Sequence, residues 1–201
     1  MKRSRRVRLA LLGTAAFAVT ACEERTDLTY FETLEQCHEA AVETDGFTGN
    51  ACDEAFADAA AVHAAKAPRY EDLALCEAQH GEGNCAPPEA AGGAEAAEAG
   101  GGSVFMPFLM GYMMGNVLSS GSRGVAGAPL YRNARSGLFT YDGRRTGFSQ
   151  PGQTATGRPG LVGRPRDMSV AKPMTRASVA RTGGFGAART AGTGGSRGFG
   201  S

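Results

Sequence analysis

The sequence predicts a mostly α-helical protein, in which a small disulfide-stapled helical domain precedes a short apolar helix and a largely disordered tail rich in glycine and arginine. Three features predict this class: four cysteines in an Ala- and Glu-rich stretch, one mostly apolar run, and a long remainder of Gly, Arg, Ser, Thr and Pro. Composition divides the chain into residues 1–21, 22–88, 89–103, 104–118 and 119–201.

Residues 1–21 have the layout of a bacterial signal peptide. Basic residues open the chain, and the apolar stretch from Leu9 to Ala21 is too short to span a bilayer and ends in small residues. Cys22 follows directly, as in a lipoprotein signal, where the first mature thiol receives diacylglycerol. We therefore predict lipidation at Cys22, with membrane lipid as a partner through the acyl anchor.

Two other interpretations of this segment stay open. Val19 and Ala21 also satisfy ordinary signal cleavage, which would release a soluble periplasmic protein, and Ser4-Arg5-Arg6 resembles a twin-arginine signal. Each of these routes leads out of the cytoplasm. Because Glu23 rather than Asp follows the anchor position, we expect an envelope protein that faces the periplasm on the outer membrane rather than the inner one.

The cysteine-containing domain, residues 22–88, carries an internal repeat. Phe31 to Cys37 and Tyr70 to Cys76 share the pattern aromatic-Glu-x-Leu-x-x-Cys, which places the aromatic, Leu and Cys side chains on one face of a helix. A glycine-containing turn and a second cysteine follow each copy. Between the copies, the Ala-rich run from Cys52 to Ala67 predicts a connecting helix.

The four cysteines allow three connectivities, and we favour the pairs local to each repeat: Cys37 with Cys52 and Cys76 with Cys85. A loop of about 15 residues contributes about 3 kcal/mol to the stability of so small a domain. A zinc site is the alternative, but the sequence has no Cys-x-x-Cys knuckle and no histidine pair at metal spacing.

No sequence motif points to catalysis. The chain has no Gly-x-Ser-x-Gly elbow, no His-Glu-x-x-His helix and no phosphate-binding glycine loop, and its histidines, His38, His63 and His80, are expected on the surface. We therefore expect a protein that is not an enzyme and that uses no cofactor and no metal. A hydrolase site hidden among the acidic residues is a further alternative.

Residues 104–118 are predicted to form an apolar helix between an Ala/Gly linker, residues 89–103, and the tail. Such a helix would be about 22 Å long, shorter than the ~30 Å hydrocarbon core, so we expect it to contact a membrane surface or a partner rather than to span a bilayer. The expected contact residues are Phe105, Met106, Phe108, Leu109, Met110, Gly111, Tyr112, Met113, Met114 and Gly115.

The methionines of this segment suggest an alternative function. On a helix, Met106, Met110, Met113 and Met114 would offer thioethers along one face, and thioethers are ligands that select Cu(I). Periplasmic copper handling is therefore the alternative to a contact role, although methionine is also an adaptable apolar packing residue.

Charge is segregated along the chain. Residues 23–98 contain eighteen Asp and Glu but only Arg25, Lys66 and Arg69 as cations, whereas residues 99–201 contain thirteen Lys and Arg against Asp142 and Asp167. This asymmetry predicts either association of the two halves or attraction of the basic tail, residues 119–201, to anionic envelope polymers and lipid headgroups. Solvated charged faces that only keep the protein soluble are the alternative.

Several of these parts also occur together in a known family. They are the signal ending at Cys22, the segment Glu82-Gly83-Asn84-Cys85, Met106-Pro107, the string Gly111-Tyr112-Met113-Met114-Gly115, and the Gly-Phe-Gly tail. In this order they resemble the YgiB-like family of uncharacterised bacterial lipoproteins, a domain of unknown function. The resemblance implies the architecture but no activity and no ligand.

Together these features predict an exported, lipid-anchored cell-envelope protein with a structural or interaction role. An envelope protein or an anionic glycan is the expected partner besides membrane lipid. Nucleic acid is not expected as a partner, because an exported protein does not meet it.

Overall fold

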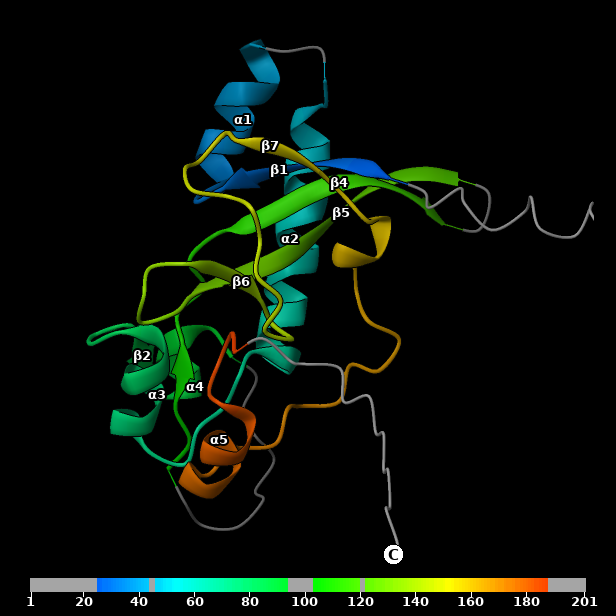
Figure 1. Ribbon diagram of the computed structural model, residues 1–201. Helices are drawn as coiled ribbons and strands as arrows, with labels where there is room; N and C mark the ends of the chain where they lie inside the picture. The colour runs from blue at the N-terminus through cyan, green and yellow to red at the C-terminus, as the bar shows by residue number, and fades with distance from the viewer. Residues whose placement is uncertain (1–24, 44–45, 94–102, 120–121, 188–201) are drawn as a thin grey trace, which may run out of the picture.

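The computed structural model describes residues 25–43, 46–93, 103–119 and 122–187, and it shows a mixed α/β protein (Figure 1). The predicted mostly α-helical class is wrong. The central element is a five-stranded antiparallel sheet with the strand order β6-β5-β4-β1-β7, and a separate two-stranded sheet pairs β2 with β3. The signal peptide and Cys22 lie outside the described residues.

The elements have the following bounds. The strands are β1 (Thr26–Phe31), β2 (Cys85–Ala86), β3 (Met106–Pro107), β4 (Tyr112–Ser119), β5 (Ser122–Arg132), β6 (Leu138–Thr140) and β7 (Thr154–Gly157). The helices are α1 (Leu34–Glu43), α2 (Gly49–Lys66), α3 (Leu73–His80), α4 (Pro88–Ala91) and α5 (Arg176–Thr182), with a 3₁₀ helix, η2, at Pro159–Leu161.

The predicted apolar helix at residues 104–118 is wrong, because this segment contains β3 and most of β4, joined by residues 108–111. Tyr112 to Ser119 form β4, which pairs with β5 as a hairpin and with β1 on its other side. Met113 packs on one face of the sheet with Leu28 and Leu130, and Met114 packs on the other face against α1 and α2. The sequence of a strand that is buried on both faces is a continuous apolar run. Periodicity does not distinguish such a run from a short buried helix.

The predicted disorder of residues 119–201 is also wrong for its described part, because residues 122–187 form β5, β6, β7, η2 and α5. The glycines that suggested disorder allow close packing. At Gly127, in the middle of β5, a β-carbon would collide with the backbone of Ala55 on α2. The helix can therefore approach the sheet this closely only because the strand has no side chain there.

Helix α2 lies along one face of the sheet, as Figure 1 shows. Its buried side chains include Ala55, Ala59 and Val62, which follow one another at helical spacing. The helix predicted over Cys52 to Ala67 is thus present, with bounds that differ by a few residues. The opposite face is covered by Phe148, Leu161 and Val162 from the segments after β6 and β7.

The cysteine-containing region does not fold as a separate unit. Its first segment forms β1, where Leu28 pairs with Gly115 of β4 and with Ala155 of β7. The predicted linker, residues 89–103, begins within α4, and its residues 94–102 lie outside the described part. Within that described part, none of the helices combines the length and the apolar character that a membrane crossing requires.

Gly127→Ala should lower the free energy of unfolding by about 2–3 kcal/mol, because the new methyl group forces α2 away from β5. Gly124→Ala is the matched control in the same strand, since a β-carbon there meets no atom within 4 Å. Urea unfolding followed by circular dichroism measures both. Equal stability of the two variants would contradict the close approach.

Candidate functional site

Two disulfides crosslink the helices, and they have the connectivity that the sequence predicts. Cys37 on α1 bonds to Cys52 on α2 with an S–S distance of 2.06 Å, and Cys76 on α3 bonds to Cys85 on β2 at 2.03 Å. All four cysteines are buried, so each crosslink belongs to the protein interior rather than to a surface redox site.

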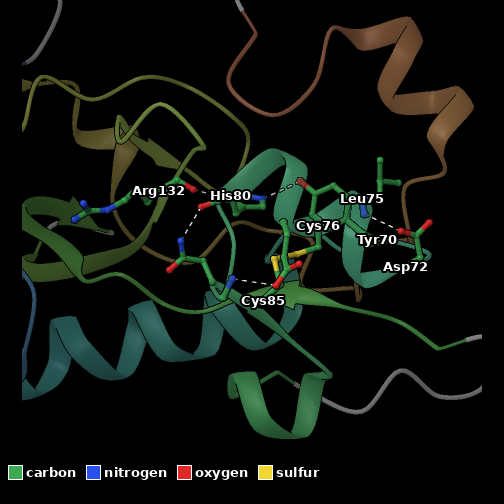
Figure 2. The surroundings of a disulfide bond; sticks show 10 residues. Tyr70, Asp72, Leu75, Cys76, His80, Cys85 and Arg132 are labelled. Atoms are coloured by element: carbon green, nitrogen blue, oxygen red, sulfur yellow. Dashed lines mark hydrogen bonds between the residues drawn. A yellow bond between two sulfur atoms is a disulfide. The ribbon is translucent and has the colours of Figure 1, made fainter.

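The second disulfide lies beside a buried histidine (Figure 2). Nδ1 of His80 is 2.8 Å from the carbonyl oxygen of Arg132 at the end of β5, and Nε2 is 2.8 Å from the hydroxyl of Tyr70. Because a carbonyl only accepts, Nδ1 carries the proton and donates, and the neutral ring then accepts the Tyr70 hydroxyl at Nε2. The histidine therefore joins α3, the segment before it and β5.

His63 on α2 makes an equivalent arrangement in the opposite tautomer, with the proton on Nε2. Nε2 of His63 donates to the carbonyl of Ala91 at 2.7 Å, and Nδ1 accepts the hydroxyl of Tyr131 at 3.0 Å. Tyr131 immediately precedes Arg132 on β5, so both histidines attach to the same end of one strand. We call His63, His80, Tyr70 and Tyr131 the histidine–tyrosine network.

Burial keeps the histidine–tyrosine network uncharged. His63 and His80 are 2% and 1% exposed, and burial lowers the pKa of His80 to about 4. Burial, assisted by the positive charge of Arg69, lowers the pKa of His63, and burial raises the pKa of both tyrosines. With each ring nitrogen hydrogen-bonded and the rings enclosed, the network positions α2, α3 and β5 and offers no open ligand atom.

Sequence reasoning missed this network, since it expected all three histidines at the surface. Of the three histidines, only His38 is partly exposed, and it pairs with Asp53 at 3.1 Å. A signal for His63 was available, because it follows Ala55 and Ala59 at four-residue spacing on the buried face of α2. His80 and its partner Tyr70 are brought together by folding, and their spacing carries no comparable signal.

The ten predicted contact residues are placed inside or against the fold rather than on a helix, and none of them is exposed. Gly111, Tyr112, Met113, Met114 and Gly115 are buried in or beside β4, and Met106 is buried in β3. The remaining residues are half-buried: Phe105, Phe108, Leu109 and Met110.

The methionine stripe of the copper alternative does not form. Met113, Met114 and Met106 each belong to a different apolar cluster, because successive residues of a strand point to opposite faces. Nor do the described residues bring three or more His, Cys, Asp or Glu side chains together in a group that could hold a metal ion.

The family model described as "Protein of unknown function (DUF1190)" matches residues 25–195. The chain belongs to the DUF1190 family. A "UPF0441 protein" of Erwinia tasmaniensis is 32% identical to it over 188 residues, which cover 89% of this chain and 78% of that protein. A second, of Serratia proteamaculans, is 31% identical over 183 residues, covering 89% and 79% of the two chains. No solved structure matches the chain.

The predicted resemblance to a family of unknown function is thus confirmed. The family match begins at Arg25, directly before β1, and covers all the described elements. The disulfides and the histidine–tyrosine network of this DUF1190 protein therefore lie wholly within the family region.

Acid should destabilise this DUF1190 protein through His80. The unfolded histidine takes up a proton near pH 6.5 and the folded one near pH 4, so between these values the unfolded chain binds more protons. Stability should fall by about 3 kcal/mol as the pH is lowered through that window. Urea unfolding at a series of pH values measures this slope.

His80→Gln should flatten the pH dependence in that window, because it removes the buried imidazole. An undiminished slope in the His80 variant would show that other groups cause the acid sensitivity.

Replacing Cys37 and Cys52 together by Ala should lower the free energy of unfolding by about 3 kcal/mol, because the unfolded chain loses a closed loop of about 15 residues. Thermal and urea unfolding of the oxidised proteins measure the loss. In reductant, which also opens the disulfide between Cys76 and Cys85, the parent and the variant should have similar stability. A variant as stable as the oxidised parent would refute the crosslink's role.

Proposed function

We propose that this DUF1190 protein is an exported, lipid-anchored protein of the bacterial cell envelope with a structural or interaction role. The observation that carries the proposal is the pair of buried disulfides, each formed within its own repeat. Disulfides persist in the periplasm and at cell surfaces and are rare in the reducing cytoplasm. The basic start, the apolar stretch and Cys22 of the sequence support the same destination.

The position of Cys22 supports a close attachment of the fold to lipid. Thr26, where β1 begins, comes four positions after Cys22, and a fully extended chain spans at most about 3.6 Å per residue. An acyl anchor on Cys22 would therefore hold β1 within about 14 Å of the membrane surface. Two or more acyl chains bind a bilayer far more firmly than a single chain does.

The apolar run does not supply a surface for a partner, because it contributes to the interior. An envelope protein or an anionic glycan remains the proposed partner, with the protein facing the periplasm on the outer membrane. A role without catalysis is part of the proposal, and it is supported by a histidine–tyrosine network whose ring nitrogens are all hydrogen-bonded.

Cells that express the full chain with radiolabelled palmitate should yield a labelled protein, and Cys22→Ser should abolish the label. Cys37→Ser is the control, since it removes a thiol but leaves the anchor position intact. Intact-mass analysis of the purified protein should show cleavage before Cys22 together with the mass of the acyl groups. An unlabelled protein with a bare Cys22 would overturn the anchor.

A further inference from the structure

Arginines from two turns surround a hollow of about 640 Å³ next to β6. Arg135 comes from the turn that joins β5 to β6, and Arg144 and Arg145 come from the turn that follows β6. The remaining lining residues are Asn133, Gly137, Phe139, Asp142, Gly143, Gly186 and Ala187. We call this space the arginine hollow.

The charge of the arginine hollow is not balanced by its own lining. Its single carboxylate, Asp142, accepts a hydrogen bond from the Thr140 hydroxyl and pairs with Nε of Arg144 at 2.8 Å. Among the described residues, no carboxylate lies within ion-pair distance of Arg135 or Arg145, and both are exposed at the rim. Two guanidinium groups thus remain available to an anion.

Hydrogen bonds fix the backbone that carries these arginines. The side-chain oxygen of Asn133 accepts the backbone N–H groups of Arg135 at 3.1 Å and Gly137 at 2.9 Å. In the other turn, the N–H of Thr140 donates to the carbonyl of Arg144 at 3.0 Å, and the N–H of Arg144 donates to the Thr140 hydroxyl at 3.2 Å. The arginine backbones are therefore held in place before a ligand arrives, which lowers the entropic cost of binding.

A second hollow of about 220 Å³ adjoins the first and is also lined by cations: Lys66, Arg69 and Lys172. The two hollows share Asp142, Gly143, Gly186 and Ala187 as a common wall. Gly186 adopts a φ of +74°, and a β-carbon there would collide with the ring of Phe139. Glycine at this position leaves room for the ring of Phe139, which lines the arginine hollow.

We propose that the arginine hollow binds a phosphate ester, carried either by a soluble sugar phosphate or by a phospholipid headgroup. Guanidinium groups bind phosphate oxygens through two parallel hydrogen bonds, and the volume exceeds that of a bare phosphate and suits a group of sugar size. This inference deepens the proposed function by naming its partner's chemistry, and it rests on that function only for the source of the phosphate in the cell.

Isothermal titration of the purified full chain with glucose 1-phosphate tests the proposal. We expect saturable binding that is weakened about tenfold or more in the double variant R135A/R145A. The double variant R25A/R166A removes the same charge from exposed positions that line neither hollow, and it should bind like the parent. Matching thermal unfolding midpoints of the three proteins show that the fold is intact.

Two further probes distinguish the sources of the phosphate. Inorganic phosphate tests whether the phosphate group alone suffices. Flotation with phosphatidylcholine vesicles with and without phosphatidylglycerol tests an anionic lipid headgroup, because the choline of phosphatidylcholine offsets the charge of its own phosphate. If binding of any one of the three probes is weakened in R135A/R145A, the proposal is supported, and the probe that binds identifies the source. An acyl anchor would contribute equally to flotation with both vesicle types, so the difference between them reports the headgroup alone.

Equal loss of binding in the two double variants, or no saturable binding to any of the three probes, would overturn the proposal. Failure of palmitate labelling at Cys22 would instead overturn the lipid anchor and leave the titration result unchanged, so the two proposals fail separately.

Discussion

The close contact between α2 and β5 holds this protein together. In the middle of β5, Gly127 lets the strand approach the backbone of Ala55, and near the end of the strand Tyr131 bonds to His63. The other parts attach to this pair of elements: the disulfide at Cys52 joins α1 to α2, and His80 joins α3 to β5 through the carbonyl of Arg132. Small residues therefore determine how closely α2 approaches β5, and larger side chains such as Tyr112 and Met114 fill the rest of the space between the helices and the sheet.

The features that depended on local sequence could be predicted, and those that depended on distant pairing could not. Cys37 and Cys52 lie 15 residues apart at the ends of a repeat, so their pairing was visible in the spacing. By contrast, β1 at Thr26–Phe31 finds its partners at Tyr112–Gly115 and Thr154–Gly157, more than 80 residues away in the sequence. Gly127 suggested disorder by composition, and only its position opposite α2 shows why a glycine is needed there.

The segregated charges of the sequence meet one another in the folded protein. Arg164 pairs with Asp58 at 2.7 Å, and Arg176 pairs with Asp72 at 3.0 Å, so cations of the basic half contact carboxylates of the acidic half. Exposed pairs of this kind contribute little stability, typically about 0–1 kcal/mol, so they orient the halves more than they bind them together. Arg135 and Arg145 take no part in this matching, which leaves their charge for a ligand from outside the chain.

The disulfide between Cys76 and Cys85 and the hydrogen bonds of His80 constrain the same short segment. The crosslink spans nine positions, and the histidine lies between its two cysteines. Because the closed loop already limits the conformations of the unfolded chain, less entropy is lost when the imidazole is fixed between Tyr70 and Arg132. In a reducing compartment that advantage would disappear while the cost of burying the ring would remain, so this part of the fold is suited to the oxidising surroundings that we propose for the protein.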